Sequence, residues 1–181
     1  MKRKTTGFTL AELMVTVAIA GTLLGIGIPA FAALSERASA QSSFATLTVA
    51  LSKARIAAIT RRHPVTVCPS RDGITCRTDL IWDGGWIVYD DAQRQPQPTT
   101  GSVLWWEQPS SGNIAVRSTV GRHRVRYQPD GMAGGANLTL TLCSPRTGLT
   151  LGQVLVNLGG RIRSESPTQP DTCPFRIGKE A

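Results

Sequence analysis

The sequence predicts an α+β fold in which one long N-terminal helix packs against antiparallel β-strands. Residues 13–34 carry no charged side chain, and apolar residues then recur every three or four positions as far as residue 58, a spacing typical of a helix. From residue 64 onward, short apolar runs alternate with turn-forming residues, which indicates strands. Residues 64–181 are too few for two domains but sufficient for one small core.

The uncharged stretch is long enough to cross a membrane as a helix. Its 22 residues would span roughly 33 Å, and the hydrocarbon layer of a bilayer is about 30 Å thick. Lys2, Arg3 and Lys4 precede it and would stay in the cytoplasm by the positive-inside rule. The remainder of the chain is therefore expected outside the inner membrane.

The helical pattern continues beyond the membrane segment. Pro64 cannot continue a helix, so the helix is expected to end just before it, after roughly 50 residues. Most of the charged residues lie away from the apolar stripe, so the second half of the helix should pack on a sheet. The predicted stripe consists of Phe44, Leu47, Leu51, Ala54 and Ala58.

Seven short runs in the remaining sequence are predicted to be antiparallel strands. Residues 93–101, rich in proline and glutamine, are expected to form a loop. Trp86 lies in an alternating run, so packing in the core is expected for it rather than stacking on a base or a sugar. The predicted strands are residues 65–68, 86–89, 103–106, 114–116, 124–127, 138–143 and 153–157.

Four cysteines in an exported domain imply two disulfides, and three pairings are possible. Cys68 and Cys76 lie close together around a turn, whereas Cys143 ends a strand and Cys173 lies in the tail. We predict the pairs Cys68–Cys76 and Cys143–Cys173, the second holding the tail to the sheet and stabilising it by about 2–4 kcal/mol. Zinc is the alternative, but the sequence has no CxxC pair and its two histidines lack ligand-like spacing, so no metal is expected.

No pattern in the sequence predicts an enzyme or a cofactor. Paired carboxylates, an activated nucleophile and a phosphate-binding loop are all missing from it. The function is therefore expected to be binding or assembly.

The charge distribution favours a polyanionic partner. The formal charge is +8, and without Lys2, Arg3 and Lys4 there remain 17 basic and 12 acidic side chains. Fifteen of these 17 are arginine, whose guanidinium pairs with phosphate through two hydrogen bonds. Residues 72–110 contain six acids and two bases, whereas residues 111–181 contain nine bases and four acids. An arginine-rich C-terminal half is typical of a surface that binds polyanions.

The first candidate cluster is the run Gly-Arg-Ile-Arg at residues 160–163, just after a predicted strand. If this segment is extended, Arg161 and Arg163 point to the same side because side chains alternate. They would project from a loop edge, with Ser164 and Ser166 offering further hydrogen bonds.

The second candidate cluster is Arg122, Arg124 and Arg126, which alternate onto one face of a predicted strand. For both clusters the alternative is a solvated strand face with surface ion pairs. The sequence leaves open whether the second cluster joins the binding surface.

The N-terminus resembles the class III signal of type IV pilins and type II secretion pseudopilins. The matching residues are Gly7, Phe8, Thr9, Leu10 and Glu12. The resemblance implies that a membrane prepilin peptidase cuts after Gly7 and N-methylates Phe8. Residues 1–7 would then be a leader peptide and residues 8–34 the transmembrane and filament-core helix.

The same resemblance implies two assembly residues. Glu12 would pair with the N-terminal amine of Phe8 in a neighbouring subunit and so set the register of a filament. Its alternative is an interfacial acid at a helix N-terminus, favoured by the helix dipole. Pro29 occupies the place where the helix of pilins can melt in the filament. The alternative there is a mild kink in a continuous helix.

The head resembles the GspH/FimT branch of minor pilins and pseudopilins. The resemblance rests on residues 65–68, on Trp-x-x-Gly-Trp-Ile-Val-Tyr at residues 82–89 and on Tyr-Gln-Pro-Asp-Gly at residues 127–131. It implies the type IV pilin fold. Residues 35–63 would be the part of the helix packed on the head, and residues 64–181 a β-rich head in the periplasm and then on the pilus surface.

Some FimT-type minor pilins of naturally competent bacteria bind DNA through a C-terminal Gly-Arg-x-Arg motif, which Gly160, Arg161 and Arg163 match. The resemblance implies non-specific binding of double-stranded DNA for uptake in natural transformation. Arg176 and Lys179 would extend this DNA-binding surface, because the disulfide at Cys173 is expected to hold the tail beside it. Two alternatives remain. One is a structural minor pilin that primes or caps pilus assembly, and the other is a type II secretion pseudopilin. In every case the other partners are pilins in a filament and the prepilin peptidase.

Overall fold

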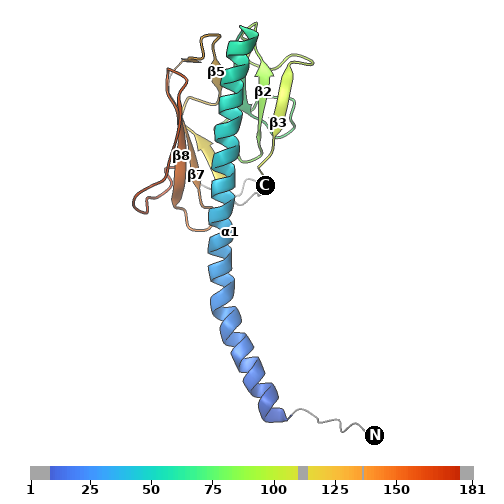
Figure 1. The fold of residues 1–181 in the computed structure, drawn as a ribbon, viewed down its shortest axis with the longest axis vertical. Helices are drawn as coiled ribbons and strands as arrows, with labels where there is room; N and C mark the ends of the chain where they lie inside the picture. Colours follow the sequence, from blue (N-terminus) through green and yellow to red (C-terminus); the bar gives the residue numbers. More distant parts are fainter. Residues whose placement is uncertain (1–8, 110–113, 136, 176–181) are drawn as a thin grey trace, which may run out of the picture. The chain divides into compact units, whose positions relative to one another are not determined.

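The structure is a computed structural model that describes residues 9–109, 114–135 and 137–175 (Figure 1). The chain divides into two compact units, Met1–Glu36 and Arg37–Ala181. One helix, α1 (Leu10–Arg61), contributes to both units and is 52 residues long, so the prediction of a single long helix is confirmed. The described strands all belong to the second unit, which confirms the α+β class.

In the first unit, the described residues are almost entirely α1. Its large apolar side chains are exposed, as at Ile26 and Phe31, each 74% exposed. An 18-residue window of α1 has a mean hydropathy of 2.1, so the helix is long and apolar enough to cross a membrane. Pro29 lies inside α1, and the helix continues through it. The helix of the single chain is therefore continuous at Pro29, and its melting in a filament stays a prediction.

The C-terminal end of α1 lies where the sequence predicted. The last helical residue is Arg61, and Arg62 follows in a left-handed conformation with a φ of 59°. A left-handed residue is a common helix terminator, although glycine usually supplies it. Pro64 then leads into the first strand, β1 (Val65–Pro69).

The described residues of the head form two antiparallel sheets. Among them, the first sheet has five strands in the order β3-β2-β1-β5-β6, and the second has four in the order β4-β7-β8-β9. The seven predicted strands are all present, with small shifts at their ends, and residues 93–101 are a loop as predicted. The sequence missed β6 and β9. The remaining strands are β2 (Trp86–Asp90), β3 (Val103–Glu107), β4 (Ala115–Ser118), β5 (Val125–Tyr127), β6 (Ala133–Gly134), β7 (Leu138–Cys143), β8 (Thr150–Val156) and β9 (Ile162–Glu165).

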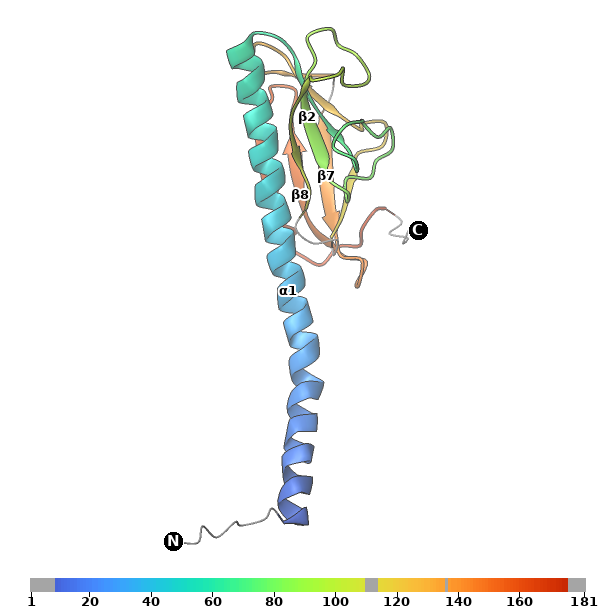
Figure 2. The same ribbon diagram turned by 90° about the vertical axis from the view of Figure 1, so that its right-hand side faces the viewer.

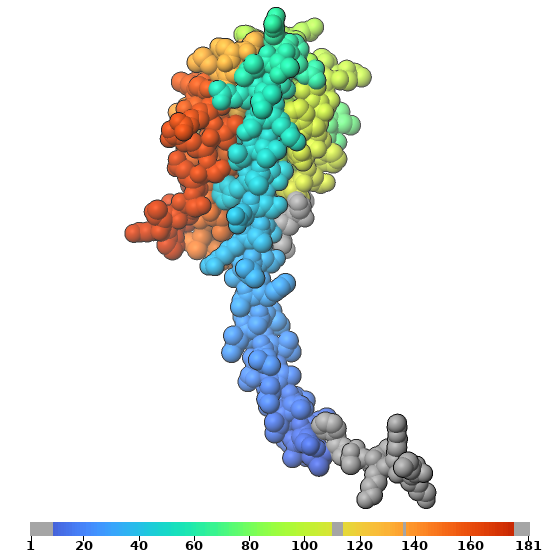
Figure 3. Space-filling view, viewed as in Figure 1, coloured from blue at the N-terminus to red at the C-terminus, as the bar shows by residue number. Residues whose placement is uncertain are grey.

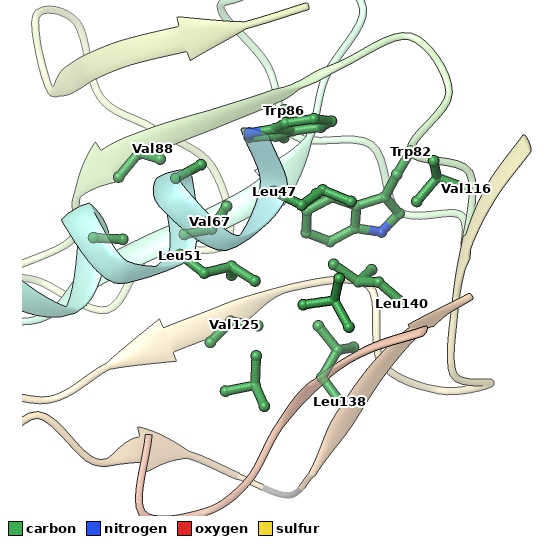
Figure 4. Close-up of a cluster of buried hydrophobic side chains, with 14 of the residues drawn as sticks. Leu47, Leu51, Val67, Trp82, Trp86, Val88, Val116, Val125, Leu138 and Leu140 are labelled. Atoms are coloured by element: carbon green, nitrogen blue, oxygen red, sulfur yellow. The ribbon is translucent and has the colours of Figure 1, made fainter. Parts of the chain in front are cut away.

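The core of the head lies between the second half of α1 and the two sheets (Figure 2). In the space-filling view this part of α1 is seated between the β2–β3 side and the β8 side of the head (Figure 3). Leu47 and Leu51 are completely buried, and Leu47 lies close to Trp82 and Trp86 (Figure 4). The core position predicted for Trp86 is therefore confirmed.

The predicted helical stripe is buried with one partial exception. Phe44 is half-buried and packs against the edge of the core. A Cβ atom added at Gly152 of β8 would overlap the Phe44 ring, so the close approach of helix and strand requires a glycine there.

The first disulfide joins Cys68 and Cys76, as the sequence predicted, within a smaller apolar cluster that includes Ile87 and Tyr89. Gln97 fixes this loop from the facing segment. Its side-chain amide donates to the Cys76 carbonyl at 2.9 Å, and its Oε1 accepts from the Cys76 amide at 2.8 Å. The disulfide loop and the loop at residues 93–101 therefore support each other.

The second disulfide joins Cys143 and Cys173, again the predicted pair. It fastens the tail to the second sheet at the start of β8. There the Cys173 amide donates to the Gly148 carbonyl at 2.8 Å, and Thr172 forms an isolated bridge with Leu149.

Candidate nucleic-acid interface

The first arginine cluster lies at an edge of the second sheet. Arg161 immediately precedes β9, and Arg163 lies within it. Both arginines are exposed, whereas Ile162 packs against the core and the Ser164 hydroxyl lies 3.1 Å from a hydroxyl of α1. The alternation of side chains therefore places the two arginines on the same face, as the sequence predicted.

Two details of that prediction are wrong. The arginines were expected on a loop edge, but backbone pairing with β8 makes residues 162–165 an edge strand. Ser164 was expected to assist Arg161 and Arg163, but the alternation that brings those two together turns Ser164 toward α1. Ser166 forms no hydrogen bond with either arginine among the described residues.

A groove of about 220 Å³ runs beside the two arginines on the outer face of the second sheet. Its walls include amide, hydroxyl and aliphatic side chains, and none of its described residues is aromatic. It is lined by Arg161, Arg163, Asn137, Leu138, Thr139, Leu155, Val156, Asn157 and Glu165. The groove therefore offers hydrogen-bond donors and two positive charges beside the single carboxylate of Glu165, and its described residues offer no stacking platform.

Neither guanidinium of this cluster has an acceptor within the described residues. Arg161 is held by its backbone instead, since its amide donates to the Asn157 side chain at 2.8 Å. Glu165 lines the same groove but forms no ion pair of 4.0 Å or less with a described residue. Both arginines are thus free to contact an external anion.

The β8–β9 turn, residues 157–160, places Arg161 next to the groove. The Gly160 amide donates to the Asn157 carbonyl at 2.9 Å, and the Leu158 amide donates to the Asn137 side chain at 3.1 Å. Gly160 itself is buried and has a φ of 72°, a left-handed conformation that favours glycine. The sequence grouped Gly160 with the DNA-binding residues, but burial makes it part of the support of the turn.

Arginines of the second cluster are engaged in internal contacts. The Arg126 Nε atom donates to Asp91 at 2.6 Å, and Arg124 donates to the Pro96 carbonyl at 2.8 Å. Arg124 also lies 2.8 Å from the Nε2 atom of His123. Burial, and then the charge of Arg124, lower the pKa of His123. Arg122 is the exposed member. The cluster therefore does not present three free guanidinium groups on one face.

Several predicted site residues lie outside the described residues, namely Gly7, Phe8, Arg176 and Lys179. Cys173 was expected to bring the tail beside the first cluster. Instead it is bonded to Cys143 at the end of β7, next to the start of β8 and at the opposite end of β8 from the turn that carries Arg161. Cys173 does not anchor the tail next to these arginines.

Glu12 completes a capping box at the start of α1. Its Oε2 atom accepts from the backbone amide and from the hydroxyl of Thr9, both at 2.9 Å, and the Thr9 hydroxyl accepts from the Glu12 amide at 3.3 Å. This contact agrees with the alternative reading of Glu12 as an acid at a helix N-terminus. Pairing with the Phe8 amine of another subunit stays a prediction.

The sequence missed three residues that support the first cluster, Arg55, Asn137 and Asn157. Asn157 stands two residues before a Gly-Gly pair, a composition typical of a tight turn, and could have been recognised from it. Arg55 and Asn137 gave no such signal, because their partners Gly131 and Leu158 are 76 and 21 residues away in the sequence.

Comparison with known families gives two matches. A family model described as type II transport protein GspH matches residues 44–160, which is more than half of the chain. A model of the prokaryotic N-terminal methylation motif matches residues 2–28, a segment that includes Gly7, Phe8 and Glu12. None of the curated protein sequences compared with the chain matches it.

The fold is similar to that of the type IV minor pilin FimU of Pseudomonas aeruginosa PAO1 in two crystal forms. The TM-scores are 0.58 and 0.57, each at 15% identity, covering 77% and 74% of this chain and 98% of FimU. The minor pseudopilin EpsH from the type 2 secretion system of Vibrio cholerae gives a TM-score of 0.47 at 11% identity, covering 72% of this chain and 99% of EpsH. At such identities the likeness to FimU shows the fold alone. The family match over more than half of the sequence shows more: the chain belongs to the GspH family, as a minor pilin or pseudopilin with the type IV pilin fold.

Proposed function

We propose that this minor pilin binds double-stranded DNA without sequence preference through Arg161 and Arg163, for uptake of extracellular DNA. One observation carries the proposal. Two exposed arginines, which have no side-chain acceptor among the described residues, lie on one face of the sheet edge, beside a groove lined by polar and aliphatic side chains. Arginines elsewhere in the head, such as Arg117 and Arg126, form ion pairs with aspartates.

The composition of the groove favours duplex DNA over single strands. Proteins that bind single-stranded nucleic acid stack bases on aromatic side chains, and none of the described residues that line this groove is aromatic. Guanidinium groups that contact phosphate release counterions and read no base, so the binding should be independent of sequence. One head is expected to bind with a Kd on the order of 10⁻⁴ to 10⁻⁶ M at physiological salt.

Weak binding by a single head suits a subunit of a filament. The N-terminal methylation motif and the apolar α1 favour an inner-membrane anchor before assembly. Processing is proposed to occur after Gly7 and to leave a methylated Phe8 as the first residue. Several heads in one filament would raise the effective affinity without any new contact. Retraction of the filament would then draw bound DNA toward the cell.

The proposal is tested by titrating short duplex DNA with the full chain in nanodiscs of zwitterionic lipid. Arg161→Ala/Arg163→Ala is expected to weaken binding at least tenfold. Because two phosphate contacts are lost, the slope of log Kd against log salt should fall by about 2 units. An unchanged affinity and slope would overturn the proposal.

A matched control removes the same charge elsewhere on the head. Arg71 and Arg146 are both exposed, in the Cys68–Cys76 loop and in the β7–β8 turn, away from the groove. Arg71→Ala/Arg146→Ala should leave the affinity within about threefold of the wild-type value, because remote exposed charges are screened. An equal loss in both double variants would point to attraction by net charge instead of a site.

The second candidate is a pseudopilin of type II secretion. The observation that favours it is the family match itself, since the family is described by type II transport. Deletion of the gene separates the two functions. Loss of DNA uptake with piliation and secretion retained supports the first, and retention of secreted proteins in the periplasm supports the second. Loss of piliation and twitching would instead point to a purely structural pilin.

A further inference from the structure

The β8–β9 turn that carries Arg161 is only lightly held by apolar packing. Leu158 is 48% exposed, and Gly159 is also exposed. Hydrogen bonds attach the turn to the rest of the head instead. The Leu158 carbonyl accepts from the Ala133 amide at 2.9 Å, and the Leu158 amide donates to Asn137 at 3.1 Å.

Arg55 of α1 supplies a further attachment. Its Nε atom donates to the Gly131 carbonyl at 2.9 Å, and its Nη2 atom donates to the Gly159 carbonyl at 3.2 Å. Gly131 belongs to the β5–β6 turn and Gly159 to the β8–β9 turn, so one guanidinium joins two turns that are remote in the sequence. A lysine, with a single ammonium group, cannot reproduce this planar fork.

Gly160 allows the two turns to meet. A Cβ atom added at Gly160 would overlap the Gly131 carbonyl oxygen and lie 3.1 Å from the Arg55 Nε atom. The positive φ of 72° strains any other residue at this position as well. Any larger side chain at residue 160 would therefore push the β8–β9 turn away from Arg55. Arg55, Gly131, Gly159 and Gly160 are called the Arg55 clamp below.

We infer that Arg55 and Gly160 are positioning residues for Arg161 and Arg163: the Arg55 clamp fixes the turn so that both arginines meet phosphates at once. The consequence for DNA rests on the proposed function. Arg161 follows Gly160 directly, and Arg163 lies three residues after Gly160. Motion of the β8–β9 turn is therefore transmitted to both arginines. Fixing the turn in advance removes the entropy that binding would otherwise lose in ordering it.

The first test compares variants of Arg55 for binding of short duplex DNA by the full chain in zwitterionic nanodiscs. Arg55→Ala is expected to weaken binding by about tenfold and to lower the salt slope by about 1 unit, since the two arginines then seldom contact phosphate together. Arg55→Lys keeps the charge and should still weaken binding. Wild-type affinity in both variants would overturn the inference.

Lys53 provides the matched control. It is an exposed base on the same helix, and it makes no hydrogen bond or ion pair with another described residue. Lys53→Ala removes one positive charge without touching the clamp, so affinity should change by no more than about twofold. A loss as large as that of Arg55→Ala would mean that the charge of α1, and not the clamp, is responsible.

A double-mutant cycle separates positioning from direct contact. In the Arg161→Ala/Arg163→Ala background, Arg55→Ala should cause no further loss of affinity, because the groups it positions are gone. An additive loss would show that Arg55 touches DNA itself or acts on the whole head, and would overturn the positioning role.

Amide hydrogen exchange tests the clamp without DNA. Arg55→Ala and Gly160→Ala should each speed exchange across residues 157–165, while Lys53→Ala leaves it unchanged. If the clamp variants exchange faster but Arg161→Ala/Arg163→Ala still binds DNA normally, the proposed function is refuted and the structural role of the clamp is retained. Unchanged exchange in both clamp variants would refute the clamp. Should Arg55→Ala fail to fold, Arg55→Lys and Gly160→Ala carry the same comparison.

Discussion

The Nε atom of Arg126 lies 2.6 Å from Oδ2 of Asp91, a carboxylate whose side chain is only 1% exposed. The same oxygen accepts a hydrogen bond from the Thr66 hydroxyl at 2.6 Å. The Arg126 guanidinium therefore neutralises a buried charge. Arg161 and Arg163 differ from it, because their guanidinium groups are exposed and have no acceptor among the described residues. Arginines that look alike in the sequence thus have two different physical roles.

Replacing Arg126 by methionine should destabilise the head by about 3–5 kcal/mol, because Asp91 would stay buried without a counter-ion. Urea unfolding at pH 7, followed by tryptophan fluorescence, measures the change. Arg126→Met/Asp91→Asn should recover a large part of the lost stability. A single variant within about 1 kcal/mol of the wild type would contradict the structural role.

The same variant also tests the division between the two clusters. In buffer without urea, and at a temperature at which Arg126→Met is folded, its affinity for duplex DNA should stay within about threefold of the wild-type value. A loss equal to that of Arg161→Ala/Arg163→Ala would return the second cluster to the binding surface.

Removing the Cys143–Cys173 disulfide should destabilise the protein by about 2–4 kcal/mol, since the bond closes a segment with a sequence separation of 30 residues. Cys143→Ala/Cys173→Ala should also expose the Thr150 amide, which donates to the Asp171 carbonyl at 2.8 Å. Faster hydrogen exchange of the Thr150 amide measures this local change. Peptide mapping without reductant should recover both predicted pairs from the wild type, and scrambled pairs or free thiols would contradict the assignment.

The long helix, the seven strands and the two disulfides could be predicted because their signals are local. The stripe that includes Leu47 and Leu51 repeats with the helical period, and β7 alternates strictly, so each element is visible in a short window. The pairing of Cys143 with Cys173 followed because the other two cysteines flank one turn.

The supports of the binding surface could not be predicted because they join remote segments. β9 has one apolar residue, the partly buried Ile162, among polar neighbours, and its sequence resembles a loop because its pairing with β8 leaves no local pattern. Arg55 reaches two backbone carbonyls, and backbone acceptors leave no trace in side-chain patterns. The second cluster was misjudged for a related reason, since Asp91 is 35 residues away from Arg126 in the sequence.

Asp72 should make the stability of the Cys68–Cys76 loop dependent on pH. Hydrogen bonds from the Thr75 hydroxyl, the Thr75 amide and the Ile74 amide lower the pKa of Asp72 well below its ordinary value. A carboxyl with a lowered folded pKa stabilises the protein above its unfolded pKa, which is about 3.9, and this contribution is lost as the pH falls further.

Thermal unfolding of the wild type and of Asp72→Asn, measured from pH 7 to about pH 2.5, checks this expectation. The wild type should have the higher Tm at pH 7, and the difference should shrink below about pH 4, because the Asp72 carboxyl of the unfolded chain then binds a proton that the folded protein does not. A difference that stays constant with pH would show that the charge of Asp72 is irrelevant to stability.

Glu12 allows helix capping to be separated from pairing with a neighbouring subunit. Its carboxylate closes the capping box with Thr9, and glutamine serves the same capping role. Glu12→Gln should therefore keep α1 intact and the protein in the membrane, yet lose the negative charge that would meet the Phe8 amine. We expect this variant to be absent from sheared filaments, measured by immunoblotting of filament and membrane fractions. Thr9→Val, which keeps the charge and removes the hydroxyl of the cap, should still assemble. Normal assembly of Glu12→Gln together with failure of Thr9→Val would show that Glu12 acts only as a cap.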